Sequence, residues 1–301
     1  MNFPRKLVLA LLAPLAYLLA AALLAALLAY PLFLLSGSDD ISTFRTLVSR
    51  GGQCVLLLGL IPLGRRFGIN TQTLGFSRGF VRQWLTGFAA GFLMLGLHLA
   101  ALVALGVRDV NWSKWTPGQV GPILGKAILI GLAIGLLEET LFRGALLAAV
   151  RRLSGPILAV IVSALFYAAL HFIGTKWTTD PDQIGWDTGI RIAIDGFSHL
   201  REAAPDNFIG LFMAGLFLGT LRVLRPNRLV LCMGIHAGWV FVIKSAKPLT
   251  TLNLQSPRWN WVGNYDYIIG YFSSAWLMLV TLVLVLMMAR PTHKSRIPYP
   301  S

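Results

Sequence analysis

The chain has 301 residues, of which 56% are hydrophobic and only 13% are charged. This composition is typical of a protein that crosses a membrane several times, and it excludes an ordinary soluble enzyme. The net charge of +14 would suit a nucleic-acid-binding protein, but the placement of the basic residues gives no reason to expect nucleic acid as a partner. Cys54 and Cys232 both lie in apolar runs, which favours two buried thiols over a disulfide or a metal site.

The first apolar run covers residues 7–35 and follows the basic residues Arg5 and Lys6. The apolar core of a cleaved signal peptide has about 7–15 residues, so the length of this run favours an uncleaved transmembrane helix. Further apolar segments occur at residues 44–64, 81–106, 119–150, 156–174, 208–222, 228–246 and 267–289. A spanning helix needs about 20 residues, so the second and sixth segments are marginal, and the fourth is long enough for a tilted helix or for two helical pieces. The sequence therefore predicts an all-α, polytopic transmembrane helix bundle with about eight spans, and six or seven spans are the alternatives.

The basic residues predict how the bundle is oriented, because cytoplasmic loops are rich in lysine and arginine. If the N-terminus is cytoplasmic, the cytoplasmic segments contain basic residues and no acidic ones, whereas the opposite side contains equal numbers of both. We therefore expect both termini in the cytoplasm and the protein in the inner membrane of a bacterium. On the opposite side, the amphipathic stretch 190–200 would form either a lid at the membrane interface or an ordered surface loop.

Three charged residues, Glu138, Glu139 and Arg143, interrupt the fourth apolar segment. Charge inside a bilayer costs several kcal/mol by common estimates and usually serves a function. Glu139 and Arg143 are four residues apart, so they share one helix face and can form an ion pair. Glu138 points about 100° away from Glu139 and could act as a general base or acid on water. The alternative is that all three form a structural knot between helices.

Two histidines also lie in apolar segments, His171 at the end of the fifth and His236 in the seventh. Membrane histidines commonly form hydrogen bonds between helices, and this is the alternative to a catalytic role. At about 1.5 Å per residue, Glu138 and the two histidines fall within about 12 Å of one another in depth. A carboxylate with two imidazoles can hydrolyse a peptide bond, either by binding a metal or by orienting water and stabilising the oxyanion.

These segments resemble the CAAX protease and bacteriocin-processing family of intramembrane endopeptidases. The family pattern Glu-Glu-x-x-x-Arg is matched by Glu138, Glu139 and Arg143. The pattern Phe-x-x-x-His is matched by His171, with Tyr167 in the place of the phenylalanine. The resemblance covers about residues 120–245 and extends to a third motif, His-x-x-x-Asn or Asp.

In that third motif His236 is present, but Val240 stands where asparagine or aspartate is expected. The resemblance implies that Glu138 is the catalytic carboxylate, that His171 acts with it, and that His236 is a second ligand or an oxyanion donor. A divalent metal, zinc, bound by these three residues would make a metalloprotease, and water alone would make a glutamate-type protease. Val240 has no donor, which implies reduced activity, a substitute donor such as the backbone or Trp239, or a non-catalytic protein.

We therefore expect an intramembrane endopeptidase that hydrolyses a peptide bond of a membrane-associated or lipidated polypeptide. Its partners would be the lipid bilayer and that polypeptide. Residues 1–118 would form N-terminal transmembrane helices, residues 119–246 the catalytic core, and residues 247–301 a loop, the last transmembrane helix and a basic tail. The alternative is a non-catalytic membrane scaffold, such as an immunity or sensor protein on the same fold. A transporter would need inverted repeats or paired broken helices, and neither is visible.

Overall fold

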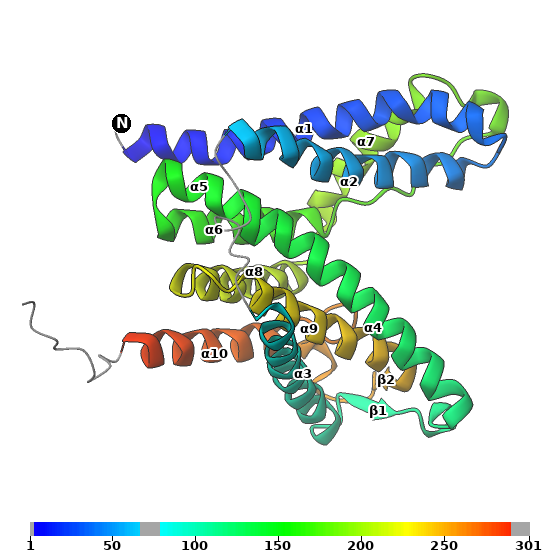
Figure 1. The fold of residues 1–301 in the computed structure, drawn as a ribbon. Coiled ribbons are helices and arrows are strands. Elements are labelled where there is room, and N and C mark those ends of the chain that lie inside the picture. Colours follow the sequence, from blue (N-terminus) through cyan, green and yellow to red (C-terminus); the bar gives the residue numbers. More distant parts are fainter. Residues whose placement is uncertain (1–2, 67–78, 290–301) are drawn as a thin grey trace, which may run out of the picture.

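The computed structural model describes residues 3–66 and 79–289, which are almost entirely helical (Figure 1). The expected basic tail after residue 289 lies outside these residues. The helices of the described part are α1 (Phe3–Ser36), α2 (Ile41–Arg66), α3 (Phe80–Ala104), α4 (Pro117–Glu139), α5 (Leu147–Ser154), α6 (Pro156–Leu170), α7 (Thr188–Ser198), α8 (Pro205–Leu224), α9 (Leu229–Leu249) and α10 (Tyr271–Ala289). Two short strands, β1 (Arg108–Val110) and β2 (Thr250–Leu252), pair antiparallel.

Among the described residues, seven helical segments are long and apolar enough to cross a membrane. The fourth of them runs from Pro117 to Ser154 because α4 continues through a π-helical turn, Thr140–Leu146, into α5. The remaining expected span is the shorter apolar helix α6. The prediction of an all-α polytopic bundle is therefore confirmed. The start of α1 and the end of α10 lie on the same side of the molecule (Figure 1), and that this side is cytoplasmic stays a prediction.

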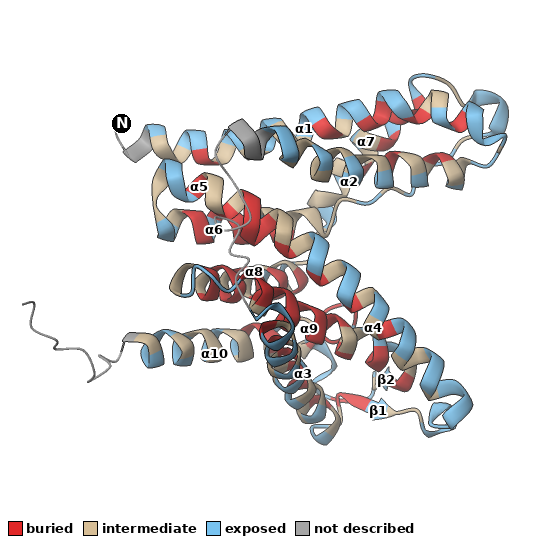
Figure 2. Cartoon of the chain, viewed as in Figure 1, coloured by how far each residue is buried: buried red, intermediate tan, exposed pale blue. Residues whose placement is uncertain are grey.

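Helix α9 lies at the centre of the bundle. Figure 2 shows that buried residues concentrate on α8 and α9, whereas the outer sides of α1, α2, α3 and α10 are exposed. Glycines let the neighbouring backbones touch α9: a Cβ added to Gly91 of α3 would lie 2.1 Å from the carbonyl oxygen of Ile235, and one added to Gly135 of α4 would lie 2.7 Å from that of Met233. Such close approach is how transmembrane helices pack when burial of apolar surface offers little driving force.

Helices α1, α2 and α7 form a separate layer beside this core (Figure 1). Their contact is apolar and includes Phe33 of α1, Phe44 of α2 and Ile192 of α7. The amphipathic stretch 190–200 is thus largely helical and packs on α1 and α2. Helix α3, which the sequence analysis grouped with the N-terminal helices, instead packs along α9 in the core. Helix α10 packs on α8. That residues 119–246 form the catalytic part stays a prediction.

Candidate active site

The π-helical turn that follows α4 contains Arg143, whose side chain is fully buried with that of Glu139. Nη1 of Arg143 donates to Oε1 of Glu139 at 2.9 Å, and Nη2 lies 3.4 Å from the carbonyl oxygen of Gly215 in α8. Two fully buried charges need each other, because either one alone would carry an uncompensated desolvation cost. The ion pair therefore ties the end of α4 to α8.

Glu139 also holds His236 of α9 in place. Nδ1 of His236 lies 2.9 Å from the same Oε1 atom that accepts from Arg143. Because Glu139 is paired with a guanidinium, we assign it as the carboxylate and Nδ1 as the donor. Nε2 of His236 is then an acceptor and faces Glu138. This orienting role of Glu139 was missed by the sequence analysis, which treated Glu139 and Arg143 as a structural pair only.

His171 presents its other ring nitrogen to Glu138 in the same way. It is the residue that ends α6, and its Nδ1 donates to the carbonyl oxygen of Tyr167 at 2.7 Å. Nε2 of His171 lies 3.8 Å from Oε2 of Glu138, and Nε2 of His236 lies 3.8 Å from the same oxygen. The structure therefore brings Glu138, His171 and His236 together from α4, α6 and α9.

The atoms that these three side chains turn toward one another are all hydrogen-bond acceptors: Oε2 of Glu138 and Nε2 of the two histidines. Oε2 of Glu138 is buried and makes no hydrogen bond to another described residue. A distance of 3.8 Å is too long for a hydrogen bond and is one that a water molecule can bridge. Three converging acceptors are stabilised by a proton, by a water molecule that donates to two of them, or by a cation. The Glu138 side chain as a whole is 28% exposed.

The donor types also suit a divalent metal, because neutral imidazole and carboxylate are common zinc ligands. Within residues 3–66 and 79–289, however, no group of three histidine, cysteine, aspartate or glutamate side chains is arranged as a metal site. Ligands of tetrahedral zinc lie about 3.3 Å apart, as follows from bond lengths of about 2.0–2.1 Å. Glu138 and the two histidines would thus have to move closer by about half an ångström to hold zinc.

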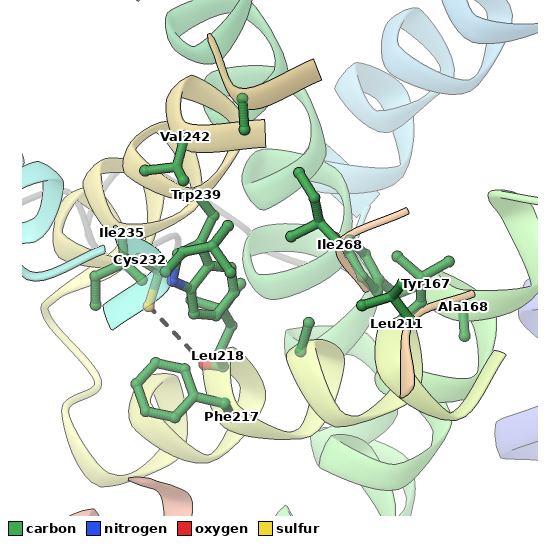
Figure 3. Close-up of a cluster of buried hydrophobic side chains, with 14 of the residues drawn as sticks. Tyr167, Ala168, Leu211, Phe217, Leu218, Cys232, Ile235, Trp239, Val242 and Ile268 are labelled. Atoms are coloured by element: carbon green, nitrogen blue, oxygen red, sulfur yellow. Dashed lines mark hydrogen bonds between the residues drawn. The ribbon is translucent and has the colours of Figure 1, made fainter. Parts of the chain in front are cut away.

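An apolar pocket reaches the site at His236, between α3, α8, α9 and α10, and Glu138 and His171 are not part of its wall. Tyr167, His236 and Val240 line it together with apolar residues such as Leu211 and Trp239. Figure 3 shows Tyr167 beside Leu211 on one side of the buried cluster and Trp239 beside Leu218 on the other. Val240, one helical turn after His236, thus faces the same pocket and presents only methyl groups to it.

The segment after β2 brings a further aromatic residue to the site. The ring of Tyr265 lies 6.2 Å from that of His171, between centroids, and burial raises the pKa of Tyr265 to about 12. Its backbone N–H donates to Asn207, whose own amide donates to Asn264. No motif in the sequence points to Tyr265, because only the fold of residues 253–270 places it beside α6.

Residues 120–242 match the family model described as type II CAAX prenyl endopeptidase Rce1-like. The match begins in α4 and ends in α9, so it contains all three segments that form the site. It confirms the family resemblance, and with the apolar helices it indicates a multi-pass membrane protein with a polypeptide substrate. The chain has no match among curated proteins or among solved structures.

Proposed function

We propose, because residues 120–242 match the CAAX prenyl endopeptidase family, that this membrane protein is an intramembrane endopeptidase. Its substrate would be a membrane-associated or lipidated polypeptide. The observation that carries the proposal is the position of Oε2 of Glu138, which lies 3.8 Å from Nε2 of both His171 and His236. A carboxylate with two imidazoles turned toward it is suited to hold and activate one water molecule.

In this mechanism Glu138 takes a proton from the water as the water oxygen attacks the carbonyl carbon of the scissile peptide bond. The carbonyl oxygen becomes an oxyanion in a tetrahedral intermediate. Glu138 then returns the proton to the amide nitrogen and the carbon–nitrogen bond breaks. The products are a carboxylic acid and an amine, and the acid passes its proton to the amine to give a carboxylate and an ammonium group. His171 and His236 orient the water, and each is fixed by its Nδ1 donor, to Tyr167 and to Glu139 respectively.

A divalent cation such as zinc is the alternative occupant of the same place. Glu138, His171 and His236 would hold it, and it would acidify the attacking water. A strong chelator would abolish the activity of the zinc-containing site. It would not affect a site in which Glu138 activates water without a metal.

The apolar pocket favours a substrate with an apolar group near the scissile bond. It begins at His236 and Tyr167 and continues between α3, α8 and α10 with almost wholly apolar walls. Its free volume of about 50 Å³ would hold a small apolar group of the substrate beside His236, and a longer chain would require the surrounding helices to separate. Burial of the apolar group would contribute about 25 cal/mol for each Å² of apolar surface removed from water.

The test replaces Glu138 with glutamine, which keeps the shape and removes the base. We expect hydrolysis of a synthetic prenylated peptide by the purified protein in detergent to fall by about 10²–10⁴-fold, the usual contribution of a general base. Glu202→Gln is the matched control, because the Glu202 side chain is exposed and lies in a short 3-10 helix after α7. Activity of Glu138→Gln equal to that of an active wild type would overturn the mechanism.

Two extensions of the same experiment decide the remaining points. Preincubation with a strong chelator, followed by metal analysis of the protein, separates the zinc version from the water version. Comparison of the membrane proteomes of cells with wild type and with Glu138→Gln identifies the substrate as a protein whose cleaved form is lost.

The second candidate is a non-catalytic scaffold, and Val240 is the observation that favours it. The wall of the pocket next to His236 is apolar at the place where the family pattern has an amide or a carboxylate. A scaffold would bind lipidated polypeptides in the pocket without cleaving them. Binding of the prenylated peptide without any product, in wild type and in Glu138→Gln alike, would establish this candidate.

A further inference from the structure

The proposed hydrolysis requires a hydrogen-bond donor for the carbonyl oxygen of the substrate. That oxygen becomes negatively charged when water attacks, and a donor already in position stabilises it most effectively. The three converging side chains do not supply one in the state assigned above, because Glu138 is the base and Nε2 of each histidine is an acceptor. Arg143 is fully buried and directed at Glu139 and Gly215.

The pocket wall restricts the choice of donor. The hydroxyl of Ser273 donates to the carbonyl oxygen of Gly270, and the indole N–H of Trp276 donates to that of Met94. Val240 offers no donor. Two donors of the lining remain for a ligand, the hydroxyl of Tyr167 and the indole N–H of Trp239.

Of these two, Tyr167 lies closer to the reacting atoms. Its hydroxyl oxygen is 3.5 Å from Nε2 of His236, which itself faces Glu138. The ring of Trp239 packs on Phe217, and its centroid is 6.4 Å from that of His236. We propose that the hydroxyl of Tyr167 donates a hydrogen bond to the substrate carbonyl oxygen and stabilises the oxyanion. This role rests on the proposed endopeptidase function.

The surroundings of Tyr167 hold its hydroxyl ready for this role. The side chain is only 3% exposed. Its ring contacts the guanidinium of Arg143, 4.4 Å from the ring centroid, and the imidazole of His171, whose centroid is 4.5 Å away. Phe142 meets the same ring edge-on at 5.2 Å. A ring fixed on three sides loses little further freedom when a substrate binds.

The chemistry of these contacts also favours donation. A cation over the face of a phenol draws electron density from the ring and thereby makes the O–H a stronger donor. The present contact of the hydroxyl with Nε2 of His236 is long, at 3.5 Å, and is therefore a weak hydrogen bond. Little interaction energy is lost when the O–H turns from His236 to a substrate. Tyr167 and Val240 line the same pocket. The hydroxyl of Tyr167 therefore supplies the hydrogen-bond donor that Val240 lacks.

The test is Tyr167→Phe, which removes one oxygen atom and keeps the ring. We expect kcat for the prenylated peptide to fall by about 10²–10³-fold, the usual loss for one oxyanion donor, with KM changed by less than about threefold, since the hydroxyl acts mainly in the transition state. Tyr30→Phe is the control, because Tyr30 packs on Trp186 in the layer of α1, α2 and α7. A purely structural role of Tyr167 would change the amount of folded protein rather than kcat per folded molecule.

A double variant tests the nature of the lost group. Tyr167→Phe/Val240→Asn places an amide donor on the same pocket, and we expect it to recover at least about tenfold of the lost kcat. Equal activity of the single and double variants would mean that the missing group is not a donor to this pocket, and would overturn the proposal.

The outcomes separate this proposal from the proposed function. If Glu138→Gln is inactive and Tyr167→Phe keeps the kcat of wild type, the role of Tyr167 is overturned and the endopeptidase mechanism stands. If wild type and Glu138→Gln are equally active, or if wild type does not cleave the substrate, both proposals fall together.

Discussion

The layer of α1, α2 and α7 and the core around α9 are suited to a membrane in different ways. Helix α1 has no charged residue between Lys6 and its end, and it shows leucines such as Leu24 and Leu28 to the lipid. Helix α9 is enclosed by other helices and holds His236 against two glutamates. The difference shows that apolar length places a chain in the membrane, whereas small residues and paired charges build a site there.

Among the described residues, the core and the layer each have an ion pair between an acidic residue and an arginine four residues later, so the two pairs can be compared. Glu139 and Arg143 in the core are fully buried, whereas Asp187 and Arg191 beside α7 are both 62% exposed. Breaking each pair in the same way measures what burial adds.

The largest effect is expected from Arg143→Ala, because it leaves the carboxylate of Glu139 buried without a partner. We expect the free energy of unfolding to fall by about 3–5 kcal/mol, with loss of activity. The midpoint of thermal unfolding in detergent measures the change. Arg191→Ala is the matched control and should leave this midpoint unchanged, since an exposed ion pair contributes little. Equal shifts in the two variants would contradict the comparison.

The next effect separates the two roles of Glu139. In Glu139→Gln/Arg143→Met both buried charges are gone, so we expect stability within about 1–2 kcal/mol of wild type. Activity should still fall by about 10–100-fold, because the carboxylate that orients His236 is missing. Kinetics and unfolding of the same preparation test this. Wild-type activity in the double variant would show that the pair is structural only.

The smallest effect concerns the packing of the core rather than its charges. Gly91→Ala places a Cβ 2.1 Å from the carbonyl oxygen of Ile235, so α3 and α9 must separate. We expect a loss of about 1–3 kcal/mol in the free energy of unfolding. Gly96→Ala, on the same helix with no atom within 4 Å of the new Cβ, is the control and should be neutral or slightly stabilising. A destabilised control would point to helix bending instead of a clash.

Much of the core could be predicted from the sequence, because hydropathy gives the spans and charge in a span is rare. Glu138, His171 and His236 stood out for that reason, and the structure places them in contact. Glycine pairs spaced by four, such as Gly87 with Gly91 and Gly234 with Gly238, also carried a usable signal for close helix packing. This glycine spacing could have predicted from the sequence that α3 packs against α9.

Other features depend on long-range geometry that no local pattern encodes. The contact between Glu139 and His236 joins residues 97 positions apart, and it depends on how α4 and α9 pack. The approach of Tyr265 to His171 depends on the pairing of β1 with β2 and on the hydrogen bonds of Asn207. Residues of this kind become visible only when the helices are placed in space.

The length of α6 has a consequence for how water and substrate reach Glu138. Its 15 residues span about 22 Å, which is about 8 Å less than the hydrocarbon thickness. One side of α6 nevertheless faces outward, through Ile157 and Ile161. Lipid beside such a helix adapts by local thinning. His171, at the end of α6, would then lie at the floor of a shallow depression in the membrane surface. A polar peptide could descend there while its apolar anchor stays in the surrounding lipid.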